Sequence, residues 1–136
     1  RLWEPENVLS DAPYWWEQIT DTGADLLLTR GTPRGGENVP DCLASGGTAQ
    51  ECGIPKENLA EVNPLLEMDL PERTYVVDLT EYVCPAVDDD TKPNCDAVVG
   101  NLLVWYDTDH FTTPFSQSLS PAIEEEMSTE LPRLFR

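Results

Sequence analysis

Four cysteines are the residues of this chain whose spacing says most about chemistry. Cys42 and Cys52 enclose nine residues, and Cys84 and Cys95 enclose ten. Both spacings are wider than the roughly two to four residues of a zinc site, and the Cys-x-x-Cys pattern of a redox pair is absent. We therefore expect disulfides, which form in an oxidising place: the periplasm, the cell surface or the exterior.

Four cysteines allow three disulfide pairings. The local one joins Cys42 to Cys52 and Cys84 to Cys95; it needs the least ordering of the chain, and each closure stabilises by about 2–3 kcal/mol. Either crossed pairing would tie the first cysteine loop to the second. A twin Cys-x₉-Cys helical hairpin fits the first spacing alone, and glycines and prolines between the cysteines disfavour helix there. The sequence favours the local pairing.

The loop CPAVDDDTKPNC and the aspartate after it offer oxygen ligands that suit Ca²⁺. The candidate ligands are Asp88, Asp89, Asp90, Asn94 and Asp96. Counted from Asp88, position 6 is not glycine and position 12 is not glutamate, so the loop is not an EF-hand. A solvated, aspartate-rich turn is the competing interpretation.

A second polar cluster, Asp107, Asp109 and His110, follows the apolar segment 97–106. It is either a metal or acid–base site or a polar turn. His110 is the single histidine of the chain, and the sequence has no Gly-x-Ser-x-Gly, His-Glu-x-x-His or phosphate-binding glycine loop. Lacking an assembled nucleophile and base, the chain is expected not to be an enzyme.

The chain is strongly acidic, with 26 Asp and Glu against 8 Lys and Arg and a net charge of −18. Such a field repels nucleic-acid phosphates and anionic lipids, so we expect no nucleic-acid partner and no membrane contact by this segment. The apolar run 97–106 is also far shorter than the ~20 residues needed to span a bilayer. A basic protein or a divalent cation remains as a partner.

The N-terminal segment is expected to become helical in its second half, with Ser10 or Asp11 as N-cap and Gly23 as the stop. Trp15 and Trp16 are neighbours about 100° apart on a helix, so both cannot face the centre of one core. One is then a core residue and the other an interface candidate. Burial of both under loops, or a carbohydrate platform, are the alternatives.

Segments 73–84 and 97–107 are rich in β-branched and aromatic residues and predict strands. With the cysteine loop between them they predict one long antiparallel hairpin, in which Gly100 marks a bulge or a close approach of the backbone. Segment 25–30 predicts a buried strand or the end of the preceding helix, and 31–58 predicts a long loop.

A C-terminal helix is expected from Ser120, its N-cap, to Pro132. Together these elements predict a single domain over 1–136 of the α+β class. It would have an antiparallel sheet, an N-terminal helical segment, a C-terminal helix and disulfide-closed loops.

The order of these features resembles the soluble ectodomain of minor pilins of type IV pili and of related pseudopilins. LWEPENVLSDAPYWWEQ looks like the tryptophan-containing segment that follows the family's N-terminal helix, and LPERTYVVDL looks like the first strong strand of its head. The resemblance implies an ectodomain of a longer membrane-anchored chain that packs against other subunits of a surface filament. No functional residue is carried over.

The first functional expectation is thus a non-catalytic, extracytoplasmic assembly subunit. Its candidate contacts are Trp15, Trp16 and the loops 31–58 and 84–96. The alternative is an extracellular module that binds calcium or carbohydrate through the acidic loops and aromatic residues.

Overall fold

The computed structural model describes residues 5–34, 37–59 and 63–131, with the backbone alone for 5–10. The helices are α1 (Pro5–Thr20), α2 (Val39–Ala44), α3 (Thr80–Val83), α4 (Thr113–Ser118) and α5 (Ser120–Glu130), with 3₁₀ turns η1 (Lys56–Asn58) and η2 (Pro64–Glu67). The strands are β1 (Leu26–Thr29), β2 (Ile54–Pro55), β3 (Thr74–Val77), β4 (Asn94–Cys95), β5 (Val98–Val99) and β6 (Leu102–Leu103). The α+β class with antiparallel strand pairs, N- and C-terminal helices and two disulfides is confirmed.

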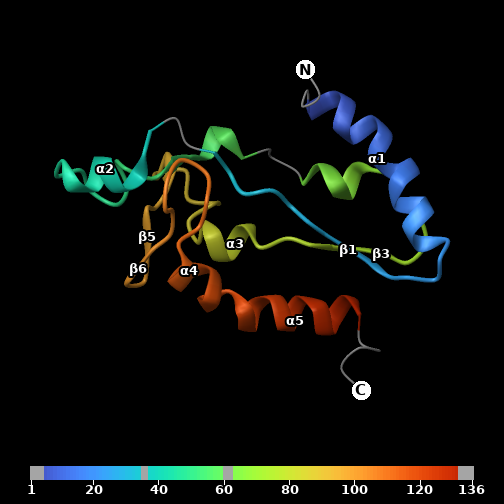
Figure 1. The fold of residues 1–136 in the computed structure, drawn as a ribbon. Helices are drawn as coiled ribbons and strands as arrows, with labels where there is room; N and C mark the ends of the chain where they lie inside the picture. Colours follow the sequence, from blue (N-terminus) through green and yellow to red (C-terminus); the bar gives the residue numbers. More distant parts are fainter. Residues whose placement is uncertain (1–4, 35–36, 60–62, 132–136) are drawn as a thin grey trace.

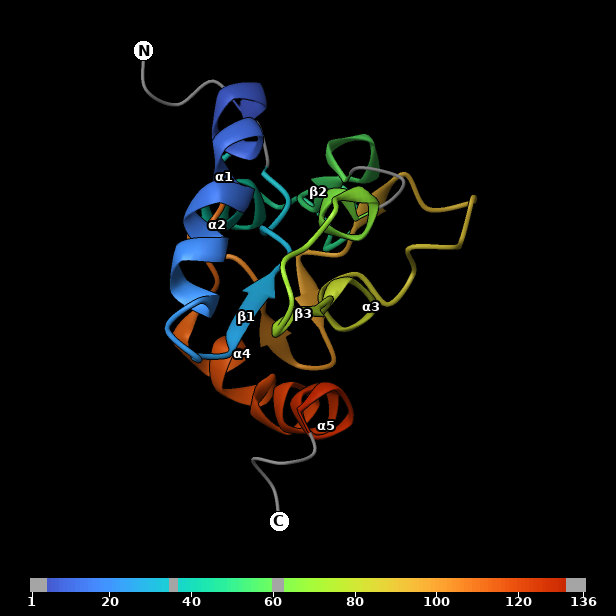
Figure 2. The same cartoon turned by 90° about the vertical axis from the view of Figure 1, so that its right-hand side faces the viewer.

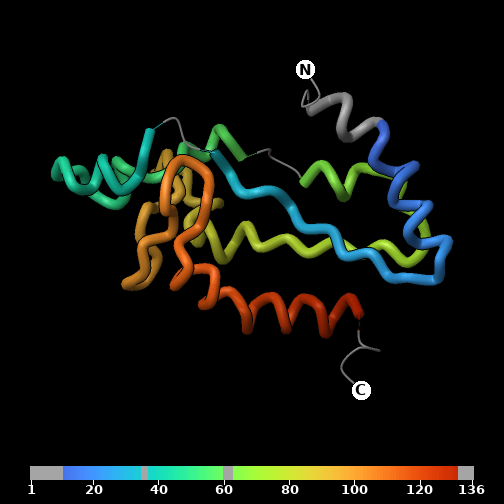
Figure 3. The backbone as a smooth tube through the Cα atoms, viewed as in Figure 1, coloured from blue at the N-terminus to red at the C-terminus, as the bar shows by residue number. Residues whose placement is uncertain are grey.

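The longest strand pair, β1 with β3, is parallel, which the sequence did not predict. Its register places Leu26 opposite Thr74 and Thr29 opposite Val77. In Figures 2 and 3 the two strands run side by side, with α1 leading into β1 and α5 lying alongside. Two parallel strands need a long connection, and here the chain between them carries α2, β2 and both 3₁₀ turns.

The predicted hairpin between 73–84 and 97–107 is wrong. β3 ends at Val77, and Thr80–Val83 forms α3 instead of continuing the strand. Asp78 causes the change, because its Oδ1 accepts the backbone N–H of Thr80 at 2.9 Å and the Thr80 hydroxyl at 2.5 Å. A side chain that binds the backbone two residues on competes with the strand ladder.

Segment 97–107 is also not one strand. β5 and β6 pair antiparallel with each other, Val98 opposite Leu103 and Val99 opposite Leu102. Gly100 lies in the connecting turn with φ of 61°, a left-handed conformation that favours glycine. Gly100 is therefore a turn residue and not a bulge.

An opposite-charge pair lies at each end of the parallel ladder. Before the strands, Arg73 Nη2 lies 3.1 Å from Asp25 Oδ1; after them, Arg30 Nη1 lies 3.4 Å from Asp78 Oδ2. The sequence shows the symmetry, since DLLLTR pairs with RTYVVD. A slip of one residue would break both pairs, so they specify the register.

The disulfides are Cys42–Cys52 and Cys84–Cys95, the local pairing that the sequence favours. They come together because β2 pairs antiparallel with β4, which places Ile54 opposite Cys95. Between them, Gly53 lies so close to the Cys95 carbonyl oxygen that a Cβ at this position would overlap it. Each disulfide closes a local loop, and the β2–β4 pair joins the two loops.

The long loop expected over 31–58 contains helix α2, which carries Cys42. Asn38 caps the helix by accepting the backbone N–H of Asp41 at 3.1 Å. The sequence predicted no helix between Cys42 and Cys52. This is wrong for the two residues after Cys42, which belong to the end of α2. The glycine pair that follows ends the helix, with Gly46 at φ of 95°.

Both terminal helices differ from their expected starts. α1 begins at Pro5, so Ser10 and Asp11 are not its N-cap, and Pro13 lies inside it. α5 is confirmed, but Leu119 and not Ser120 is its N-cap, because α4 runs directly into it. Pro132 lies outside the described residues.

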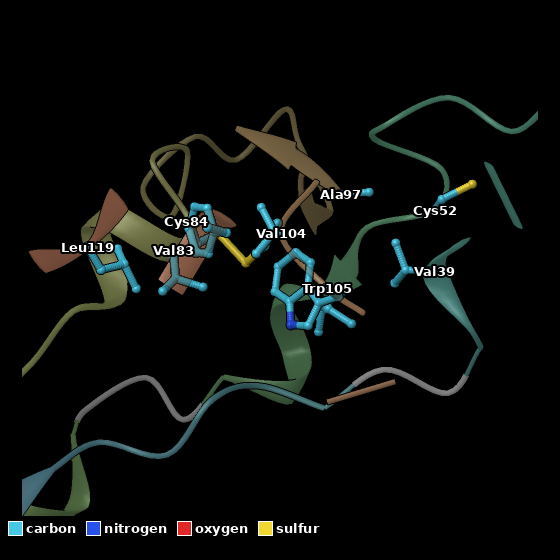
Figure 4. Packing of buried hydrophobic residues seen from close by; sticks show 11 residues of the cluster. Val39, Cys52, Val83, Cys84, Ala97, Val104, Trp105 and Leu119 are labelled. Atoms are coloured by element: carbon cyan, nitrogen blue, oxygen red, sulfur yellow. A yellow bond between two sulfur atoms is a disulfide. The ribbon is translucent and has the colours of Figure 1, made fainter. Parts of the chain in front are cut away.

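The core surrounds Trp105, whose side chain is 0% exposed. Figure 4 shows Trp105 and Val104 between Val83, Cys84 and Leu119 on one side and Val39, Ala97 and Cys52 on the other. Both disulfides are thus part of the hydrophobic packing. Within the described part of the chain, no helix has the length and apolar character needed to cross a bilayer.

Replacing Gly53 by alanine is expected to lower the free energy of unfolding by about 1–3 kcal/mol, because the new methyl group would overlap the Cys95 carbonyl. Urea unfolding of the oxidised protein measures it. Gly31→Ala is the matched control, since nothing lies within 4 Å of a Cβ there. Equal effects of the two changes would contradict the close approach.

Reversing one charge of the Asp25–Arg73 pair is expected to destabilise the fold, and reversing both is expected to restore part of the loss. Asp25→Lys places two cations together; adding Arg73→Glu should recover about 1 kcal/mol. Adding Lys92→Glu instead should recover nothing, because Lys92 pairs with Asp96 elsewhere. If the free-energy changes of the single variants Asp25→Lys and Arg73→Glu simply add up in the double variant, the pair does not stabilise the ladder.

Candidate interaction surface

Helix α1 packs on the molecule through one side. Ala12, Trp16 and Thr20 recur every four residues and are half-buried or buried, and the helix contacts β1. This spacing places them on one helix face. Trp16 is therefore the tryptophan that faces the body of the protein.

The other side of α1 exposes a cluster of large apolar side chains, here called the aromatic face: Tyr14, Trp15 and Ile19. They are 59%, 63% and 43% exposed. The rings of Tyr14 and Trp15 meet edge to face with centroids 5.2 Å apart, and Ile19 lies one turn beyond Trp15. In Figure 1 α1 lies at the end of the molecule opposite α2. Of the two interface candidates, the structure exposes Trp15.

Acidic residues surround the aromatic face. Asp11, Glu17 and Asp21 are exposed on or next to α1, and its last turn has no basic residue. The basic side chains that the structure describes hold loops and strands together. Four form ion pairs, Arg30, Arg34, Arg73 and Lys92, and Lys56 donates to backbone carbonyls. The aromatic face thus has an acidic rim.

The acidic loop 84–96, proposed above for calcium, does not bring three of its carboxylates together. Asp88 and Asp90 are exposed. Asp89 Oδ1 accepts the Thr91 hydroxyl at 2.6 Å and its backbone N–H at 3.0 Å. These bonds lower the pKa of Asp89, and the aspartate forms a local turn.

Gln50 holds the other two candidate calcium ligands. Its Nε2 donates to Asp96 Oδ1 at 2.6 Å, and its backbone carbonyl oxygen accepts from Asn94 Nδ2 at 2.8 Å. The second Asp96 oxygen accepts from Lys92 Nζ at 3.0 Å. Partial burial opposes ionisation of Asp96, but the bonds from Lys92 and Gln50 outweigh it and lower its pKa. These bonds dock the acidic loop on the first cysteine loop.

A lysine ammonium occupies the inner side of the acidic loop. Lys56 Nζ donates to the carbonyl oxygens of Ala86 and Asp89, the latter at 2.8 Å. Backbone carbonyls are also ligands of Ca²⁺, so a calcium ion would compete with this side chain. Sequence reasoning could not find this contact, because Lys56 lies outside the loop that it fills.

The second candidate cluster, Asp107, Asp109 and His110, does come together, with ligand atoms within 4.8 Å of one another. His110 Nδ1 lies 2.8 Å from Asp107 Oδ2 and 3.2 Å from Asp109 Oδ1. Asp107 Oδ1 accepts the backbone N–H groups of Asp109 and His110 at 3.0 and 2.8 Å. Chiefly through these two bonds, the pKa of Asp107 falls to about 2.

The carboxylates of this turn favour the protonated form of His110. The hydrogen bond and charge of Asp107, then the charge of Asp109, raise the pKa of His110. Arg34 Nε lies 3.3 Å from Asp109 Oδ2 on the other side. A metal ion would have to displace the imidazole proton and oppose the guanidinium, so the arrangement fits an ion-paired turn better than a metal centre.

Comparison with known proteins gives no match: no family model, no curated protein and no solved structure is similar to this chain at a significant level. What can be said of function therefore comes from its own residues. The class that they define is a disulfide-stabilised, extracytoplasmic α+β protein.

His110 is expected to titrate above its ordinary pKa of 6.5, and Asp107→Asn should lower that pKa. Because the pKa of His110 is raised in the folded protein, its protonation adds to the free energy of unfolding. This contribution is complete below pH 6.5 and is lost as the pH rises through the pKa of the folded state. Because the chain has one histidine, proton NMR can measure the pKa of His110 in the parent protein and in the variant. Identical titration curves would show that Asp107 does not hold the imidazolium.

Proposed function

We propose that this chain is a non-catalytic, extracytoplasmic assembly domain that binds another protein through the aromatic face of α1. The disulfides support an oxidising compartment, and we infer the periplasm, the cell surface or the exterior. In the specific form that the pilin resemblance suggests, the partner is a subunit of a surface filament.

The observation that carries the proposal is the exposure of Trp15 together with Tyr14 and Ile19. Tryptophan and tyrosine are enriched among residues that dominate binding energy, and an exposed apolar cluster with a polar rim is typical of an interface. The helix that presents them is anchored by Trp16 and Thr20 on its other side. The surface is thus ready to bind without rearrangement.

Charge narrows the chemistry of the partner. A net charge of −18 disfavours association between two copies of this chain. The rim residues Asp11, Glu17 and Asp21 are acidic as well. The partner expected is therefore a different protein, with an apolar pocket for Trp15 and basic residues around it.

Trp15→Ala is expected to weaken partner binding by at least about tenfold and to change the free energy of unfolding by less than about 0.5 kcal/mol. Tyr106→Ala is the matched control, because Tyr106 is 70% exposed but lies outside the aromatic face. Photo-crosslinking from position 15 and from position 106 in producing cells identifies the partner, and titration with the purified partner then measures both variants.

The expected adduct forms from position 15 and contains a protein with a basic surface. Added salt should lower its yield, because salt screens the association of opposite charges. Equal adducts from the two positions would contradict the aromatic face as the binding surface. A homodimer crosslinked from position 15 would show that the partner is a second copy, against the charge argument.

A further inference from the structure

A cavity of about 320 Å³ is lined by residues that lie outside the aromatic face. Most of its wall is apolar. The side chains that form this wall include Leu79, Val83, Phe111, Leu119 and Ile123. Its volume is in the range of small-molecule sites.

The cavity lies where both parallel strands end. The residues after β1, 30–33, and those after β3, 78–80, line it from one side. Phe111, Leu119 and Ile123, before α4 and around the start of α5, line it from the other. Figure 1 shows α3, α4 and the first turn of α5 gathered at this end of the ladder. Crevices at the carboxyl ends of parallel strands are common binding sites.

One end of the cavity is polar. Arg30, whose side chain is 13% exposed, directs Nη1 to Asp78 Oδ2 at 3.4 Å and to the Thr80 hydroxyl at 3.1 Å. Asp78 also accepts from Thr80 N–H and from Asn63 Nδ2, both at 2.9 Å. These groups outweigh partial burial, lower the pKa of Asp78 and keep it ionised. Among the described residues at this end, the charges of Arg30 and Asp78 therefore oppose each other.

We propose that this cavity binds a small neutral amphiphile, with an aromatic or branched aliphatic body and one hydroxyl or carbonyl oxygen placed at the Arg30 end. A cavity of roughly 150 Å³ holds benzene, so this one fits about 10 non-hydrogen atoms. An ionised ligand would enter without a counter-charge, which is costly, and an anion would also meet the field of the −18 chain.

The test uses the intact, disulfide-bonded protein and four probes of similar size: 2-phenylethanol, ethylbenzene, phenylacetate and phenethylammonium. Amide chemical shifts followed by NMR report both the affinity and the site. We expect saturable binding of 2-phenylethanol, with shifts at residues 29–33, 78–84 and 111–123. The two charged probes should bind at least about tenfold more weakly.

Two variants separate the apolar and polar parts of the site. Ile123→Trp is expected to fill the cavity and abolish binding of every probe. Arg30→Gln should weaken 2-phenylethanol but not ethylbenzene, which lacks the oxygen. Arg73→Gln is the matched control, because it breaks the corresponding ion pair at the other end of the ladder and should leave both affinities unchanged.

Several outcomes would overturn the proposal. Absence of saturable shifts with all four probes would exclude the ligand class, and this result needs no variant. Tighter binding of phenylacetate would make the site an anion site. Shifts centred on Trp15 and not on the cavity would exclude the location. Absence of binding and tighter binding of phenylacetate both leave the proposal for the aromatic face untouched, so failure of the cavity proposal is distinguishable from failure of the proposed function.

Discussion

The two Asp–Arg pairs that flank the β1–β3 ladder are the constraint on which the arrangement of the molecule depends. They fix the register of two strands that are far apart in the sequence and have no turn to align them. α1 leads into the ladder at the Asp25 end, and α5 packs against β3. The cavity lies at the Arg30 end. The ladder thus places the aromatic face and the cavity in different parts of one fold.

The disulfide region is stabilised in a different way. Each disulfide closes a short loop. The two loops share one core because β2 pairs with β4 and because Trp105 lies in the same buried cluster as cysteines of both disulfides. Gln50 of the first loop and Lys56 of η1 add hydrogen bonds to the acidic loop. Their ammonium and amide groups satisfy oxygens that would otherwise be available to a cation. The conformation of the acidic loop is therefore explained by the protein's own side chains.

The strong acidity and the small number of cations have one common consequence. The described basic residues are committed to internal contacts, so the surface around α1 stays acidic. Apolar side chains within such a surface favour a basic protein as partner over a second copy. Among the described residues that line the cavity, the charged side chains are Arg30 and Asp78, which form an ion pair.

The sequence by itself determined the features that depend on short separations. Cysteines ten and eleven positions apart pair locally, a helix forms near the C-terminus, and adjacent tryptophans on a helix diverge. Tertiary structure decided the rest. Thr80–Val83 leaves the predicted strand because Asp78 binds Thr80. β3 pairs with β1, although the paired residues lie 48 positions apart along the chain. Local propensity carries no information about such distant pairing, because opposite charges and apolar faces select it only when the whole chain is compact.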